Sequence, residues 1–198
     1  MTTPLHLSDN QLKWLISTNL LACMLHLALA VLTGSIGNLA LEPPVYIVKN
    51  TFVFNSSSAG FELVPRLEAA GGFPVTILTV TFFVVTSAFH LGNVAVWPQF
   101  YFDSLEACTT PTRWLEYFIS ASIMSSIIAF LSGMRDQMMI ALTAGLIGAT
   151  MTFGFLSELL NRPAAAGDRW VGGSFAKRAA AHFAGYISYT FDWSAILF

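Results

Sequence analysis

The chain has 198 residues, of which 55% are hydrophobic and only 10% are charged, and its mean hydropathy is +0.65. An ordinary soluble domain carries about 25% charged residues, so this composition excludes one. The net charge is -2, and the lysines and arginines form no dense run, which argues against binding to nucleic acid. We therefore expect residues 1–198 to form a single integral membrane domain.

The first apolar segment, residues 12–33, is long enough to cross a bilayer, which takes about 20 residues as a helix. A long connection follows at 35–72. Within it, β-branched and aromatic residues alternate in Val45–Val48 and again in Thr51–Phe54, on either side of Lys49-Asn50. This alternation predicts a β-hairpin that turns at Lys49-Asn50.

Four further apolar segments predict membrane-spanning helices, and proline and glycine residues mark their ends. They are residues 73–97, 114–134, 138–160 and 180–198. The third and fourth spans are joined only by residues 133–137, so we expect them to form an antiparallel helical hairpin. The predicted fold is an all-α membrane protein with five transmembrane helices and a β-hairpin in its first extracellular loop.

The distribution of lysine and arginine predicts the orientation, because positive residues are retained on the cytoplasmic side of a membrane. The side that holds the N-terminus has Lys13, Arg113, Arg162, Arg169, Lys177 and Arg178. The other side has Lys49, Arg66 and Arg135. We therefore predict a cytoplasmic N-terminus and an extracellular loop at 35–72.

Three ionisable residues lie inside predicted spans, where a charge costs about 2.5–3.5 kcal/mol, so each is a candidate functional group. They are His26, His90 and Glu116. Helical spacing places His26 on one face with Asn19 and Cys23, and His90 on one face with Thr86 and Asn93. Glu158 and Asp192 are weaker candidates, and Glu158 is interpreted as interfacial.

Several roles are open for these residues. The polar residues could form ordinary hydrogen bonds between helices, and Glu116 could pair with Arg113 three residues earlier. Metal binding is disfavoured, since the histidines form no His-x-x-x-His pair and Cys23 and Cys108 do not complete a zinc site. Proton transfer or charge balancing by two imidazoles and a carboxylate is the preferred interpretation.

The segment Arg113–Met124, which reads Arg-Trp-Leu-Glu-Tyr-Phe-Ile-Ser-Ala-Ser-Ile-Met, resembles the third-helix signature of the heliorhodopsins, a family of retinal-binding membrane proteins. The resemblance covers the whole chain and implies a seven-helix fold. It also implies all-trans retinal bound to a seventh-helix lysine as a protonated Schiff base, with Glu116 as the counterion. His26, Thr86 and His90 would form a polar pocket on the Schiff-base side.

The resemblance also implies a retinal pocket, for which the candidates are Ser120, Met124, Tyr186, Tyr189 and Trp193. For the three aromatic residues, an ordinary packing face is an equal alternative. The chain departs from the family pattern because its lysines, Lys13, Lys49 and Lys177, all lie at span ends or in loops. None of them is expected to be the attachment lysine, so we expect this chain to lack it. We therefore expect a fragment that lacks helices six and seven rather than a natural five-helix protein.

The expected function is light sensing by photoisomerisation of retinal, with a slow photocycle and without ion pumping. The alternative is a proton or ion channel or transporter that uses the same histidines and glutamate without a chromophore. The sequence contains no nucleophile motif, phosphate-binding loop or metal-ligand spacing, so we do not expect an enzyme. The expected partners are retinal, the lipid bilayer and a second copy of the chain.

Overall fold

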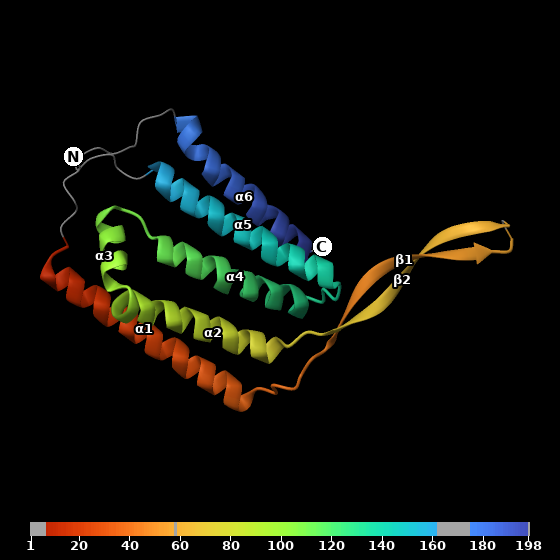
Figure 1. Cartoon of the computed structure of the whole chain (residues 1–198), viewed down its shortest axis with the longest axis horizontal. Coiled ribbons are helices and arrows are strands. Elements are labelled where there is room, and N and C mark those ends of the chain that lie inside the picture. The colour runs from red at the N-terminus through yellow and green to blue at the C-terminus, as the bar shows by residue number, and fades with distance from the viewer. Residues whose placement is uncertain (1–6, 58, 162–174, 198) are drawn as a thin grey trace.

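The computed structural model describes residues 7–57, 59–161 and 175–197, the side chains of 175–178 excepted. Within these residues, five long helices pack in chain order, and a two-stranded ribbon projects from one end of the bundle (Figure 1). The elements are α1 (Asp9–Ile36), β1 (Pro44–Asn55), β2 (Gly60–Gly72), α2 (Val75–Leu91), the π-helical segment η1 (Gly92–Val96), α3 (Pro98–Glu106), α4 (Pro111–Leu131), α5 (Gln137–Asn161) and α6 (Phe175–Leu197). Helices α1 and α6 lie at opposite edges of the bundle.

Among the described residues, four helical segments are long and apolar enough to cross a membrane. They are α1, α2 together with η1, α4 and α5. The first four predicted spans are thereby confirmed as membrane-spanning candidates. The fifth segment is helical as predicted, but it is not one of these four, so its crossing of the membrane stays a prediction.

The helix starts follow local sequence rules. Ser8 begins α1 with a capping box, in which its hydroxyl accepts from the Gln11 backbone N–H and its own N–H donates to the Gln11 side chain. Pro98 and Pro111 occupy the first turns of α3 and α4, where a missing N–H costs nothing. The short helix α3 was not predicted, because it is far shorter than a membrane span.

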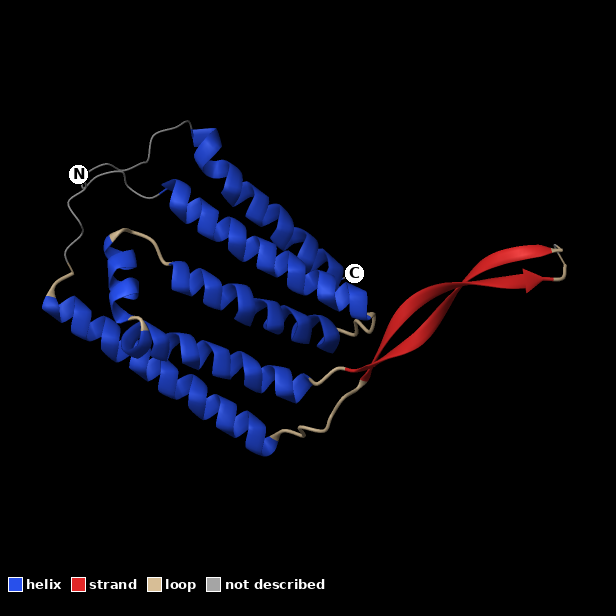
Figure 2. Cartoon of the chain, viewed as in Figure 1, coloured by secondary structure: helices blue, strands red, loops and turns tan. Residues whose placement is uncertain are grey.

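The hairpin in the first long loop is confirmed, but its predicted turn is wrong. Strand β1 runs straight through Lys49-Asn50, which pair with Arg66 and Pro65 of β2, and the chain reverses between Asn55 and Gly60 (Figure 2). The alternation of the two segments is therefore one continuous strand. The serine-rich segment supplies the turn, where Ala59 has a positive φ of 49°.

The base of the ribbon is packed onto the helices. Val45 is buried in a cluster with Phe73, Phe130 and Ile140, and the rings of Phe73 and Phe130 are stacked with centroids 4.4 Å apart. The backbone N–H of Tyr46 donates to the carbonyl of Arg135, in the connection between α4 and α5, at 2.8 Å. The ribbon is thus fixed at its base, while most of its length is exposed.

Candidate functional site

The two intramembrane histidines face one another across the contact between α1 and α2. The rings of His26 and His90 are nearly parallel, at 7°, with centroids 5.9 Å apart. His90 Nδ1 is hydrogen bonded to Asn19 Oδ1 at 2.9 Å. The predicted polar faces of the first two spans therefore meet, and Asn19 holds the His90 imidazole in place.

A second pair of polar side chains continues this contact. The Ser87 hydroxyl donates to the Cys23 carbonyl at 3.0 Å, and the Cys23 sulfur lies 3.3 Å from the same hydroxyl. The Asn19 side-chain amide donates to the Leu15 carbonyl of its own helix at 2.8 Å. The Ser87–Cys23 contact and the Asn19–His90 bond join α2 to α1, and the latter is the interhelical hydrogen bond considered for Asn19.

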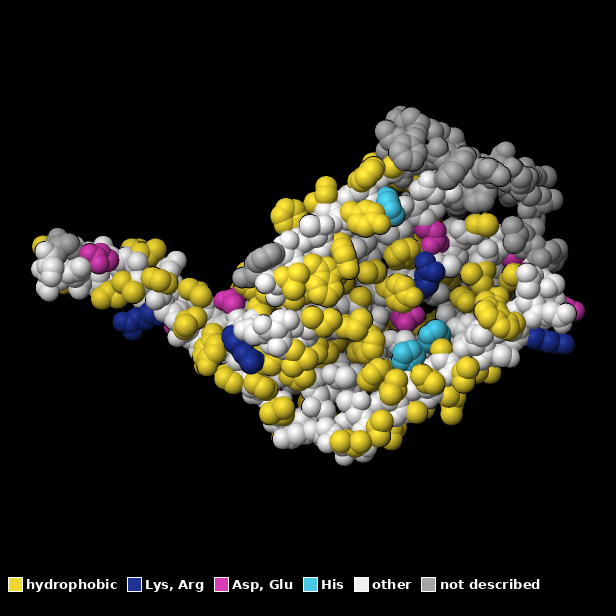
Figure 3. All heavy atoms as spheres, turned by 180° about the vertical axis from the view of Figure 1, so that it is seen from behind, with side chains coloured by type: hydrophobic (Ala, Val, Ile, Leu, Met, Phe, Trp, Pro, Cys, Tyr) yellow, Lys and Arg dark blue, Asp and Glu magenta, His cyan; other side chains and the backbone are white. Residues whose placement is uncertain are grey.

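Helix α4 carries Glu116 into the interior, where the residue is only 5% exposed. The carboxyl lies close enough to the Thr86 hydroxyl and the Arg113 guanidinium to interact with both electrostatically. Thr86 is one helical turn before His90 on α2, so α2 connects the Glu116 carboxyl with the histidine pair. Figure 3 shows two neighbouring histidine side chains with an acidic side chain beside them, among hydrophobic side chains.

The pairing of Glu116 with Arg113 is not a direct ion pair, since no salt bridge joins these two described residues. The Arg113 guanidinium instead lies over the rings of Trp114 and Tyr117, 5.2 and 5.8 Å from their centroids. Arg113 is exposed, so much of its field at Glu116 is screened by water. The buried carboxyl therefore lacks a close cationic partner among the described residues.

Several polar side-chain atoms of α1, α2 and α4 are buried without a hydrogen-bond partner in the described part of the chain. They are His26 Nδ1, Thr86 Oγ1 and Thr112 Oγ1. Native proteins pair nearly all such atoms with protein groups, water or a ligand. Water or a ligand would supply the missing partner of the Thr86 hydroxyl, which lies next to Glu116. Thr112, four residues before Glu116 on α4, was not predicted from the sequence.

The predicted retinal-pocket residues are only partly brought together. Ser120 is buried on the same face of α4 as Glu116, whereas Met124 is largely exposed. On α6, Tyr186 and Tyr189 form an exposed stripe, and Trp193 packs edge-on against Tyr189 with its indole Nε1 buried and unpaired among the described residues. Their assignment to a retinal pocket stays a prediction.

The second span ends in an irregular segment beside this site. In η1 the helix widens to a π-helical turn, a feature common at functional sites. The Trp97 ring packs directly on Gly92, where a Cβ atom would lie 2.1 Å from the ring, and its indole N–H donates to Asn93 Oδ1 at 3.1 Å. Asn93 is thereby buried and engaged one turn beyond His90.

Two carboxyl groups that were weaker candidates in the sequence form hydrogen bonds between helices in the structure. The Glu158 carboxylate of α5 accepts hydrogen bonds from the Thr110 backbone N–H, the Thr110 hydroxyl and the Trp114 indole N–H, and so ties α5 to the start of α4. Asp192 of α6 is 1% exposed and accepts a hydrogen bond from Ser125 of α4. Sequence spacing gave no sign of these contacts, because they join different helices.

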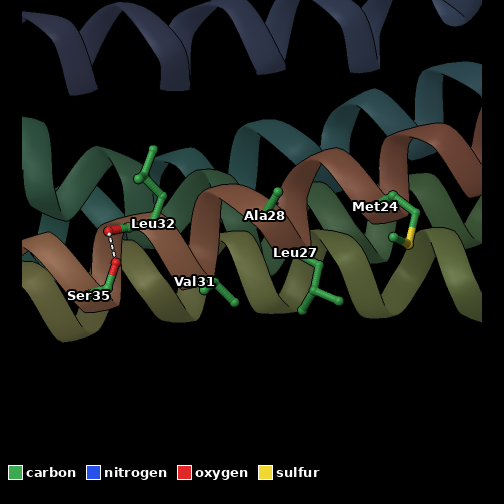
Figure 4. A pocket seen from close by; sticks show the side chains of 6 residues that line it. All are labelled: Met24, Leu27, Ala28, Val31, Leu32 and Ser35. Carbon is green, nitrogen blue, oxygen red and sulfur yellow. Dashed lines mark hydrogen bonds between the residues drawn. The ribbon is translucent and has the colours of Figure 1, made fainter.

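A shallow groove on the outer side of α1 is unrelated to this site. It is lined by Met24, Leu27, Ala28, Val31, Leu32 and Ser35 (Figure 4). The one hydroxyl in the set donates to the Leu32 carbonyl of the same helix. The groove is apolar and faces away from the histidine pair, so it suits lipid or another apolar surface.

The chain matches a known family model. The heliorhodopsin family model matches residues 15–197, and no curated protein matches the chain. The matched region contains α4 with Glu116 and the helices that carry both histidines. The chain therefore belongs to the heliorhodopsin family.

Proposed function

We propose that this membrane protein senses light through all-trans retinal, with a slow photocycle and without ion pumping. Glu116 is the counterion in this proposal, and His26, Thr86 and His90 form the polar pocket beside it. The observation that carries the proposal is the buried Glu116 carboxyl without a close cationic partner among the described residues. Such a carboxylate requires a positive charge nearby, and a protonated Schiff base supplies one.

Bound retinal would supply a light-driven change of shape and a cation that can give up its proton. Glu116 would stabilise that cation. The Thr86 hydroxyl, next to Glu116 and unpaired among the described residues, would orient the carboxyl or a bridging water. His26 and His90 lie beyond Thr86, with their rings stacked, and would accept or relay a released proton.

In this proposal, the attachment lysine is not one of the lysines whose side chains the structure describes. Lys13 is exposed at the start of α1, and Lys49 lies on the ribbon, where its ammonium pairs with Glu68 at 2.5 Å. Neither is beside Glu116. The side chain of Lys177 is not among those described.

The proposal includes the placement of the protein in a cell membrane with its N-terminus in the cytoplasm. The ribbon and the connection between α4 and α5 lie at one end of the bundle, and α3 lies at the other (Figure 1). Lys13 and Arg113 belong to the end with α3, whereas Arg162 and Arg169 lie outside the described residues. We also propose a homodimer, for which the apolar outer face of α1 offers a surface.

The test is to purify the full-length gene product and to add all-trans retinal to it. We expect a visible absorption band that bleaches and recovers slowly under illumination. Absence of any visible band, together with proton flux in retinal-free liposomes that His90→Ala abolishes, would overturn the proposal in favour of a proton path. A band accompanied by light-driven net ion transport would contradict the absence of pumping.

A further inference from the structure

Asp192 is a buried carboxyl group that the proposed photochemistry does not use. Its 1% exposure makes it one of the most buried polar side chains described. On α6 it lies on one helical face with Gly185 and Ser188, and this face packs against α5: a Cβ at Gly185 would meet Phe153, and the Ser188 hydroxyl donates to the Leu146 carbonyl. At Asp192 the same face reaches α4.

Among the described residues, the hydrogen-bond partner of Asp192 is a hydroxyl group. Ser125 Oγ lies 3.2 Å from Asp192 Oδ1 and 3.4 Å from Oδ2, and Ser125 is itself buried. No lysine, arginine or histidine among the described residues forms a salt bridge with Asp192. An ionised carboxylate in this position would be desolvated with a single neutral donor to compensate it, whereas a neutral acid is much less costly to bury.

This pair is separate from the Glu116 site. Ser125 follows Glu116 by nine positions on α4, which at about 100° per residue places the two side chains on opposite faces of the helix. Glu116 faces Thr86 of α2, and Ser125 faces α6. The helix itself stands between the two carboxyl groups.

A metal cation does not fit the Asp192 position. A hard cation takes about six or more oxygen ligands, and only one carboxylate and one hydroxyl are brought together here. No group of three or more His, Cys, Asp or Glu suited to a metal occurs in the described part of the chain. The ligand that one carboxyl and one hydroxyl can hold is a proton.

We propose that Asp192 and Ser125 form a second proton-binding site, between α4 and α6, in which the Asp192 carboxyl carries the proton and the Ser125 hydroxyl donates to its other oxygen. The proton neutralises the one acidic residue in the apolar part of α6. The site thereby lets α6 pack into the bundle as a neutral helix. The inference rests on the proposed function only in placing α6 within the membrane.

The experiment is infrared spectroscopy of the chain in lipid nanodiscs at neutral pH, without retinal, using isotopically labelled aspartate. We expect a label-sensitive carbonyl band of a protonated carboxylic acid that shifts in D₂O. Asp103→Asn, a matched change at an exposed aspartate, should leave this band in place, and Asp192→Asn should remove it. Ser125→Ala should keep the band but move it to higher frequency, because a hydrogen bond to the carbonyl is lost.

If Asp192→Asn fails to fold, the labelled wild-type chain alone still tests the proposal. Absence of any label-sensitive acid band in it would show that Asp192 is ionised and would overturn the proposal. A band that survives Asp192→Asn, or one that Ser125→Ala leaves unmoved, would also contradict it. Because retinal is absent throughout, failure here is distinct from failure of the light-sensing proposal.

Discussion

At the scale of single residues, Asn19 and His90 form a hydrogen bond that joins α1 to α2 at the histidine pair. His90→Leu leaves the buried Asn19 oxygen without its partner, so we expect a loss of about 1–3 kcal/mol in the free energy of unfolding. The double variant Asn19→Leu/His90→Leu should be less destabilised than the sum of the single variants, by about 0.6–1.7 kcal/mol. Thermal unfolding in detergent measures all three, and strict additivity would show that the bond contributes nothing.

Helical spacing in the sequence was sufficient to find the residues on each side of this bond. A period of three to four residues placed Asn19, Cys23 and His26 together, and placed Thr86 with His90. Spacing within one helix carries no information about which residue of another helix lies opposite. For that reason the partnership of Ser125 with Asp192, which are far apart in the chain, could not be predicted.

At the scale of helices, the contact of α4 with α5 depends on a glycine. The Trp114 ring lies over Gly154, where a Cβ atom would be 2.3 Å from the ring, and the same indole donates to Glu158 one turn later. Gly154→Ala should displace the ring and lower the free energy of unfolding by about 1–3 kcal/mol.

The matched control is Gly145→Ala on the same helix, where a Cβ would meet no atom within 4 Å. That change should be neutral, or stabilising by up to about 1 kcal/mol, because alanine favours the helix. Equal effects of the two substitutions in thermal unfolding would contradict the described packing of α4 on α5.

The β-ribbon shows what an alternating sequence pattern can predict and what it cannot. A period of two predicted strands correctly, because β-branched and aromatic residues favour extended backbone. It could not locate the turn, since Lys49-Asn50 continues the strand and the chain reverses between Asn55 and Gly60. Register is decided by pairing with β2, whose residues show no clear alternation of burial.

The ribbon is attached only at its base in the described structure, so its distal part should be dispensable for folding. Replacing residues 50–65 by a two-residue Asn-Gly turn removes paired backbone outside the bundle, and we expect a change below about 1 kcal/mol in stability. Phe130→Ala, in the cluster at the base, should cost about 3–5 kcal/mol. Thermal melting followed by circular dichroism compares the two variants. A larger loss of stability from the shortened ribbon than from Phe130→Ala would contradict the conclusion that only the base of the ribbon stabilises the fold.

At the scale of the whole molecule, the order and approximate ends of the first four spans followed from hydropathy and breakers. This worked because each crossing requires a long apolar helix whatever its neighbours are. The fifth helix was predicted as well. Whether it is apolar enough to cross the membrane depends on whether the buried Asp192 carboxyl is protonated, which composition does not reveal. The roles of the site residues follow neither from hydropathy nor from the positions of proline and glycine, and they stay predictions.

The predicted orientation can be measured in intact cells by labelling with a membrane-impermeant maleimide. In a Cys108→Ser background, Ser57→Cys at the tip of the ribbon should react, whereas Asp103→Cys in α3 should react only after permeabilisation, since both positions are exposed but lie at opposite ends of the bundle. Cys23 is buried and should remain silent. The reverse pattern would place the N-terminus outside.

The claim on which the functional account depends is that Glu116 balances the charge of a protonated Schiff base. Its most direct test is the visible spectrum of the retinal-reconstituted gene product with Glu116→Gln, next to Glu158→Gln, a carboxyl change on α5 outside the histidine cluster. Removing the negative charge should shift the Glu116→Gln band to longer wavelength or abolish it as the Schiff base loses its proton, while the Glu158→Gln band stays in place. An unchanged band in Glu116→Gln would contradict the assignment of the counterion.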